Sequence, residues 1–467
     1  MLNYKVKIGL IPLRRQLADE ATRKGIFDPA KARENKDHII SYIKSNFSGR
    51  DTAFVDLEWL NGEGLLSRAE QCGAVQREFE KQGVDAIFII NCNFGSEEAA
   101  GRIARMMNVP VLLWGPQDTV FEADGTRYTD CQCGLFAISK QLRRLNIPFS
   151  YIENCRVEKP VFREGFARFL SVVCMVKNFK SLKVTQVGTR LNPFKSVMSN
   201  ELEITEKFGI NISTVNMTAM TEKLTRLLEE KSAEIEAGLA EVKRLYDVGG
   251  LSDEVLRKML AFVHAYIEVF EDTEADVLLS ECWTCMPQAF GANPCLAMSI
   301  LYDMGYIVTC ESDLHGAVTQ AILQCAARGA EKPLFGEFTA RHPENENAEL
   351  LWHCGPFPYS AKREGERARL FNTKPSFRAK DGGYTIARFQ GDRGSYTLLG
   401  GSFRTTEGPN TFGTYLWAEF EDLPKLERKL IEGPYIHHMS EIFGTYEEAL
   451  REFCKYIPNL SFDQINS

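Results

Sequence analysis

The sequence predicts an α/β protein with two successive doubly wound α/β domains, followed by a β-rich, barrel-like domain. Through about residue 330, short apolar runs typical of buried parallel strands alternate with segments of helical periodicity. Beyond that point, strand-like runs are separated by Gly and Pro, as in an antiparallel sheet or small barrel. A chain of 467 residues is also long enough for two or three hydrophobic cores.

The first predicted domain, residues 1–158, has the alternating order of a Rossmann-like sheet. Its strands are expected at Lys5–Leu13, Phe54–Leu60, Asp85–Asn91 and Val109–Trp114, and its helices at Ser67–Gln82, Ser96–Met107 and Gln132–Leu145. Sites in such sheets form at the carboxyl ends of strands, where the sequence has Arg14, Arg15, Asn91, Asn93, Trp114 and Gln117. No Gly-x-Gly-x-x-Gly follows the first strand, so a dinucleotide site is not expected. The two arginines could bind an anionic or hydroxyl-rich ligand.

The second predicted domain spans residues 159–330 and continues the alternation. Its strands are expected at Val184–Gly188, Ile210–Val215, Val277–Cys282 and Ile307–Cys310, with one long solvated helix at Thr218–Tyr246. The third domain, residues 331–467, has strand-like runs at 383–388, 395–399 and 414–420 and a closing helix at Thr445–Tyr456.

Composition excludes several classes of function. A net charge of -8 argues against a nucleic-acid-binding surface, which needs clustered Lys and Arg. No apolar run approaches the roughly 20 residues that span a bilayer, and the N-terminal residues lack the apolar core of a signal peptide. The 13 cysteines follow no framework spacing and fit reduced thiols. A cytoplasmic protein is expected.

Two acids and a late histidine pair are the candidate catalytic groups. Glu311 follows an apolar strand, Glu337 lies in Phe-Gly-Glu-Phe, and His437-His438 comes near the end of the chain. Oxygen and nitrogen ligands of this kind suit a divalent metal with open positions for substrate oxygens, which points to a metal-assisted enzyme acting on a polyol or sugar. Adjacent residues of an extended segment point to opposite sides, so one histidine of the pair can bind the metal while the other faces away and orients it or contacts the substrate.

Both acids, His353 and one cysteine motif also have structural interpretations. Glu311 could be an acid at the start of a helix that Asp313 caps, and Glu337 could lie in an exposed turn. His353, in an apolar strand, could be a hydrogen-bonded core residue. The Cys282-x-x-Cys285 motif could bind zinc, but Cys295 and Cys310 do not form a second tight pair, which favours buried thiols.

Taken together, these segments resemble the L-fucose isomerase and L-arabinose isomerase superfamily. The similar segments are Cys310-Glu311-Ser312-Asp313, Phe335-Gly336-Glu337-Phe338 and Gly433-Pro434-Tyr435-Ile436-His437-His438, with further likeness at Glu281-Cys282-Trp283-Thr284 and Gly188-Thr189-Arg190. The resemblance implies a metal site, most simply for Mn²⁺, with Mg²⁺ or Co²⁺ as alternatives. Its ligands would be Glu311, Glu337 and His438, with His353 as a further ligand, and substrate contacts would come from His437, Arg14, Arg15, Asn93, Trp283 and Gln288.

The activity that the resemblance implies is aldose–ketose isomerisation of a monosaccharide, in which Glu311 and Glu337 move a proton through a cis-enediol. An isomerase of an anionic sugar such as a sulfosugar of the sulfoquinovose type is an alternative, because Arg14, Arg15 and Arg190 could bind its charge. A metal-dependent epimerase or lyase and a non-enzymatic sugar sensor are further alternatives. The resemblance also implies a homo-oligomer, a trimer or hexamer, with its active site at a subunit interface.

Overall fold

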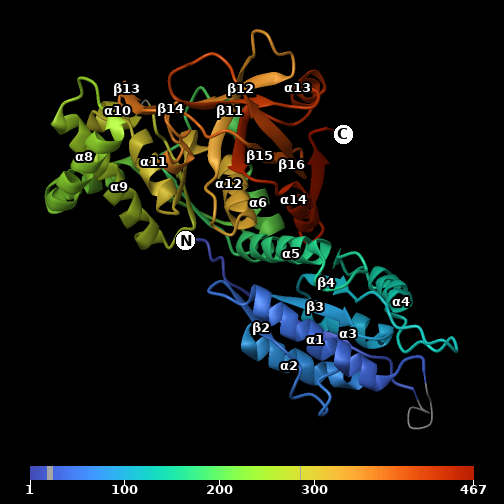
Figure 1. Cartoon of the computed structure of the whole chain (residues 1–467). Helices are drawn as coiled ribbons and strands as arrows, with labels where there is room; N and C mark the ends of the chain where they lie inside the picture. The colour runs from blue at the N-terminus through green and yellow to red at the C-terminus, as the bar shows by residue number, and fades with distance from the viewer. Residues whose placement is uncertain (18–24, 284, 467) are drawn as a thin grey trace. The chain divides into compact units, whose positions relative to one another are not determined.

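A computed structural model describes residues 1–17, 25–283 and 285–466 of the chain. By their contacts these residues form two compact units, one of residues 4–177 and one of residues 178–467 together with 1–3 (Figure 1). The predicted division into three domains, with boundaries at 158/159 and 330/331, stays a prediction. Within the described ranges, no helix combines the length and the apolar character needed to cross a membrane.

The unit of residues 4–177 is a parallel five-stranded sheet in the order β2-β1-β3-β4-β5. Its strands are β1 (Val6–Leu13), β2 (Thr52–Val55), β3 (Ala86–Asn91), β4 (Val111–Trp114) and β5 (Ser150–Tyr151). Its helices are α1 (Pro29–Phe47), α2 (Cys72–Gln82), α3 (Glu97–Met107), α4 (Cys131–Arg144) and most of α5 (Pro160–Phe179). Every residue of β3 is buried, as its continuous apolar sequence predicts for a central parallel strand.

The other unit begins with a parallel four-stranded sheet in the order β10-β9-β6-β7. Its strands are β6 (Lys183–Val187), β7 (Asn211–Val215), β9 (Val277–Ser280) and β10 (Ile307–Thr309). Its helices are α6 (Glu201–Phe208), α7 (Met217–Glu230), α8 (Ser232–Leu245), α9 (Asp253–Thr273), α10 (Cys285–Phe290), α11 (Cys295–Asp303) and α12 (Leu314–Ala326). All residues of α12 are buried, which makes this helix a rigid base for the residues at its N-terminus.

The barrel follows and is antiparallel. Its strands are β11 (Leu334–Arg341), β12 (Ala348–His353), β15 (Gly383–Asp392), β16 (Ser395–Thr406), β17 (Thr414–Glu419) and β18 (His438–Phe443). They pair in the order β16-β15-β18-β11-β12-β17, and the pairing of β17 with β16 closes the ring. The elements outside the ring are β8 (Tyr246–Asp247), β13 (Ala368–Phe371), β14 (Lys374–Arg378), β19 (Leu460–Gln464), α13 (Leu423–Glu432) and α14 (Glu447–Cys454). The predicted fold class is confirmed.

Two predicted elements are corrected by the structure. The strand expected at Phe54–Leu60 is β2 and ends at Val55, because a run of turns follows it. The long helix expected at Thr218–Tyr246 is two helices, α7 and α8, which meet at Lys231. Its charged residues Glu229 and Glu230 are exposed, as predicted. The pattern of apolar residues therefore predicted which segments form strands and helices more accurately than it predicted where those elements end.

Candidate active site

Glu311 lies directly after β10, in a short turn whose backbone is unusual. Glu311 has φ 63° and Ser312 has φ 55°, both in the left-handed region that residues with a Cβ seldom adopt. Contacts on both sides hold the turn: the Glu311 amide donates to Cys282 Sγ at 3.4 Å, and the Ser312 hydroxyl donates to the Thr189 carbonyl at 3.1 Å. Such strain persists only where surrounding contacts enforce it, and it is concentrated at functional sites.

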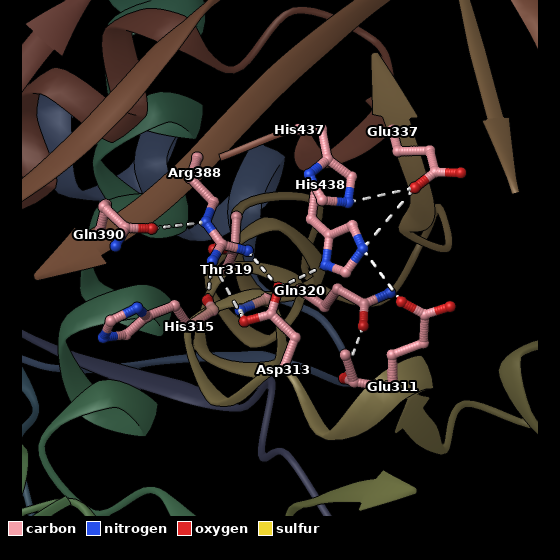
Figure 2. Close-up of polar contacts among 12 residues, drawn as sticks. Glu311, Asp313, His315, Thr319, Gln320, Glu337, Arg388, Gln390, His437 and His438 are labelled. Carbon is pink, nitrogen blue, oxygen red and sulfur yellow. Dashed lines mark hydrogen bonds and ion pairs between the residues drawn. The ribbon is translucent and has the colours of Figure 1, made fainter. Parts of the chain in front are cut away.

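Asp313 connects this turn to the barrel. Its carboxylate caps α12 by accepting from the Gly316 amide, and it pairs with Arg388 of β15, where both side chains are fully buried (Figure 2). Burial alone would favour the protonated acid, but Arg388 and His438 outweigh it and hold the pKa of Asp313 well below its usual value. Asp313 is therefore a carboxylate, and it caps the helix as predicted.

That carboxylate determines which nitrogen of His438 is available. His438 Nδ1 lies 3.0 Å from Asp313 Oδ2, so Nδ1 carries the proton that the carboxylate accepts. Nε2 then faces the acids, 3.2 Å from Glu311 Oε2 and 3.8 Å from Glu337 Oε2 (Figure 2). Burial lowers the pKa of His438, but Asp313 and Glu311 together raise it above its usual value. A cation bound at Nε2 would take the place of that extra proton.

Glu337 reaches the same point from the barrel wall. It lies on β11 directly opposite His438 of β18, and its pKa is raised chiefly because burial disfavours the charged form. His437 approaches it as well, with Nε2 3.5 Å from Glu337 Oε2 and its ring 4.4 Å from that of His438. The expectation that the two histidines face opposite sides is wrong. His437 precedes β18 and lies in a bend, so both rings reach one carboxylate.

His353, the last residue of β12, is buried beside this group. Its ring packs 5.1 Å from Phe335 and 6.0 Å from the His438 ring. Nδ1 accepts a hydrogen bond from the Cys354 amide at 2.9 Å, so a neutral His353 carries its proton on Nε2. This tautomer suits a hydrogen-bond donor to the acids better than an Nε2 ligand, and ligation by His353 stays a prediction.

The donor set fits a divalent cation. One ligand atom from each of Glu311, His353 and His438 lies within 4.8 Å of the others, and the same is true of Glu337, His437 and His438. Nε2 of His438 and Nε2 of His353 are both buried without a well-formed hydrogen bond to any described residue. Because buried polar atoms are rarely left unsatisfied, an imidazole nitrogen aimed at two carboxylates indicates a place for a metal ion.

The other residues predicted for the site lie in three places. Trp283 is at the site, and its indole donates to Glu311 Oε1 at 3.2 Å. Gln288, on α10, is exposed and has no described contact with the acids. Arg14, Arg15 and Asn93 belong to the other unit, where they gather at the carboxyl ends of β1 and β3, as predicted: the Arg15 amide donates to Asn93 Oδ1 at 2.9 Å, and Arg14 pairs with Glu63 at 2.8 Å.

Sequence reasoning missed two buried charged residues near the site. Arg388 orients Asp313, and Glu441 on β18 is fully buried with both carboxylate oxygens lacking a hydrogen-bond partner among the described residues. A Cβ on Gly336 would come within 2.8 Å of Glu441 Oε1, so the glycine of Phe-Gly-Glu-Phe makes room for this acid. Charged residues within otherwise apolar strands are the signal that could have identified both.

The buried Glu441 should make the free energy of unfolding depend on pH. Burial raises its pKa to about 8, so between the usual pKa of a glutamate and about 8 the folded chain holds a proton that the unfolded chain has lost. Stability therefore falls as pH rises through this window, by up to about 1.4 kcal/mol per pH unit. Glu441→Gln removes this titration, and urea unfolding in the presence of a chelator should show a shallower fall. Glu254→Gln, a change at a side chain that is 77% exposed, is the control. Parallel curves for Glu441→Gln and the wild type would refute the assignment.

Comparisons with known proteins agree with the resemblance. Residues 21–180 match the family model described as "Fucose/sulfoquinovose isomerase, N-terminal domain". A sulfoquinovose isomerase of Priestia aryabhattai is 25% identical over 417 residues, covering 85% of this chain and 91% of the relative. Sulfoquinovose isomerases of Alkalicoccus urumqiensis (25% identical, 79% and 83% covered) and Clostridium sp. strain MSTE9 (24% identical, 61% and 62% covered) are also similar. The resemblance to the fucose isomerase superfamily is confirmed.

Proposed function

We propose, from this similarity to the fucose isomerase superfamily, that the chain is a metal-dependent aldose–ketose isomerase whose substrate is an anionic sulfosugar, sulfoquinovose. The observation that carries the proposal is that Glu311 and Glu337 both approach Nε2 of the buried His438, at 3.2 Å and 3.8 Å. Two carboxylates beside a metal-ligating imidazole are what proton transfer between two neighbouring sugar carbons requires.

Glu311, Glu337 and His438 would hold the cation, for which Mn²⁺ is the first choice and Mg²⁺ or Co²⁺ are alternatives. The chemistry that such an ion supplies is polarisation of the sugar carbonyl and acidification of the neighbouring hydroxyl. Arg388 and Asp313 keep His438 in the tautomer that a ligand needs, because the Asp313 carboxylate accepts from Nδ1. A pre-oriented ligand loses little entropy when the ion binds.

The two acids would carry the proton between C2 and C1 of the sugar through a cis-enediol. Glu337 suits this task because its carboxyl group lies at the site beside His438, where it can accept a proton from one sugar carbon and release it to the next. Glu311 is held by the Trp283 indole on one oxygen, while its other oxygen faces His438. The Trp283 side chain is partly exposed and offers an apolar face to the sugar ring.

The names of the relatives support a sulfonated substrate over a neutral one. A sulfonate needs a cationic partner, and Arg15 is better suited than Arg14, which is buried against Glu63. The Arg15 guanidinium carbon lies 4.2 Å from the centre of the Phe94 ring. Its Nη2 lies 3.6 Å from the Glu97 carboxylate. It borders a cavity of about 460 Å³ at the carboxyl ends of β1 and β3, whose polar lining includes Ser67, Arg68 and Ser96 as well as Glu70, Glu97 and Glu98.

We therefore assign sulfonate recognition to Arg15, supplied by the N-terminal unit of a neighbouring copy in a homo-oligomer. Arg15→Ala should raise KM for sulfoquinovose at least ~10-fold, since a charge-assisted hydrogen bond contributes about 1.5–3 kcal/mol. KM for a neutral aldose should change little. Arg393→Ala, a change at a side chain that is 92% exposed, is the control. A similar rise in KM for both sugars, or no rise for either, would refute the assignment.

The proposed function is tested by turnover. Protein loaded with Mn²⁺ should convert sulfoquinovose to its ketose with a higher kcat/KM than it shows for L-fucose or L-arabinose, and chelation should abolish the reaction. A preference for a neutral aldose would overturn the choice of substrate. Full activity after metal removal would overturn the role of the ion.

A further inference from the structure

Two cysteines that lie 28 residues apart in the sequence meet beside the candidate active site. Cys282 comes shortly after β9 and Cys310 directly after β10. Sγ of Cys282 lies 3.0 Å from Sγ of Cys310, and both side chains are buried. The cysteine of the C-x-x-C motif that makes this contact is therefore Cys282, and the thiol that it meets belongs to a separate strand connection.

The geometry of this thiol pair suits a disulfide. A disulfide joins residues whose Cα atoms are about 4.4–6.8 Å apart, and its sulfur–sulfur bond is about 2.05 Å long. The pair follows two neighbouring parallel strands, which are about 4.8 Å apart. The sulfurs would have to approach by only about 1 Å. The sulfurs of a second pair, Cys295 and Cys354, are farther apart at 3.8 Å, so oxidation should join Cys282 to Cys310 first.

Each of these two cysteines is next to a residue of the candidate site. Cys310 precedes Glu311, and Cys282 precedes Trp283, whose indole donates to Glu311 Oε1 at 3.2 Å. The Glu311 amide donates to Cys282 Sγ at 3.4 Å. Because the left-handed backbone of Glu311 depends on such contacts, a movement of either sulfur should displace the Glu311 carboxylate.

We propose that Cys282 and Cys310 form a reversible disulfide that moves Glu311 away from Nε2 of His438 and thereby switches the isomerase off. The oxidant is a small peroxide such as hydrogen peroxide. The thiols themselves are buried, but the adjacent Trp283 is 38% exposed, so the route from solvent is short enough for a small uncharged molecule. The loss of turnover rests on the proposed function, whereas formation of the bond does not.

The oxidation takes place in two steps. The first thiol attacks one oxygen of the peroxide, the oxygen–oxygen bond breaks, and a sulfenic acid and one water form. The second thiol attacks the sulfenic sulfur, the sulfur–sulfur bond forms, the sulfur–oxygen bond breaks, and a second water leaves. The two sulfurs lose two electrons to the peroxide, and both thiol protons end in water. An excess of an external thiol reverses the reaction by exchange.

Peptide mapping and turnover of the same samples test the proposal. After treatment with hydrogen peroxide, alkylation of free thiols and digestion, mass spectrometry should find one peptide pair joined through Cys282 and Cys310. The kcat for sulfoquinovose should fall by at least ~10-fold, since a misplacement of about 1 Å can slow a reaction about 100-fold. Dithiothreitol should reverse both changes.

Serine variants show whether this bond causes the inactivation. Cys282→Ser and Cys310→Ser should each keep most of their own starting activity after peroxide treatment. Cys454→Ser, at a buried thiol of α14, should lose activity as the wild type does. Melting curves establish that each variant is folded, and either of the two serine variants suffices if the other is not.

Three results would overturn the proposal. They are a bond mapped to other cysteines or to none, an oxidised protein that carries the bond and turns over normally, and equal proportional losses of activity in the wild type and the serine variants. A reduced protein that isomerises no sugar would refute only the proposed function. The mapped bond would then still decide whether the disulfide forms, and a loss of Mn²⁺ affinity on oxidation would report the displacement of Glu311.

Discussion

Replacing Glu311 by glutamine is expected to lower kcat by at least ~100-fold, the loss that follows removal of a positioned acid or base. Glutamine keeps the shape and the hydrogen bond from Trp283, but it removes one negative charge opposite His438 and the group that accepts the proton. The loss should appear in kcat as well as in kcat/KM, because the missing interaction belongs to the transition state. Steady-state kinetics with saturating Mn²⁺ measures both.

The left-handed backbone of Glu311 makes a control for folding necessary. Glutamine and glutamate have the same shape next to the backbone, so the left-handed conformation costs both the same, and the melting temperature of metal-free Glu311→Gln should stay close to that of the wild type. Glu254→Gln, at an exposed position, controls for the loss of one negative charge. Turnover within a few-fold of the wild type would contradict the role assigned to Glu311.

The two adjacent histidines should differ in kind. His438→Ala removes a fully buried imidazole whose Nε2 faces both acids, so metal content and activity should fall together. Metal affinity should fall by about 10-fold to 100-fold, and excess Mn²⁺ should restore part of the activity. His437→Ala removes a side chain that is 47% exposed and should leave metal content near normal while raising KM or lowering kcat.

Metal analysis of the two purified variants decides this prediction. His437 is a demanding control, because its ring also reaches Glu337 and a purely electrostatic effect on that acid would be shared by both histidines. Equal retention of metal in the two variants would show that His438 is not the principal imidazole ligand. Loss of metal only in His437→Ala would exchange their roles.

The fold was largely predictable from local patterns. β3 and β10 are continuous apolar runs, and Ser96 and Asp313 cap the helices that follow them, so strand and helix could be located from residues near in sequence. The ends of strands and helices were less predictable. The break between α7 and α8 at Lys231 and the end of β2 at Val55 leave no mark in the spacing of apolar residues.

The candidate site was only partly predictable. Glu311, Glu337 and the His437-His438 pair were candidates from the sequence itself, but the residues alone left both acids with a structural interpretation, and only the resemblance assigned the ligand role to His438. The contacts that orient them were hidden, because Arg388 lies 75 residues from Asp313 and Glu441 lies in another strand of the barrel. The side that His437 faces depended on where β18 begins, and the contact between two distant thiols depended on the pairing of β9 with β10.

Isomerisation in deuterated water tests the central claim most directly. Mn²⁺-loaded protein incubated with sulfoquinovose should form the ketose. Proton magnetic resonance should show deuterium entering C1 of the ketose and C2 of the recovered aldose, because carboxyl groups that carry the proton exchange it with solvent. Glu311→Gln should show neither reaction nor exchange. Absence of ketose, or ketose that keeps all of the original hydrogen through repeated turnover, would contradict proton transfer by these acids.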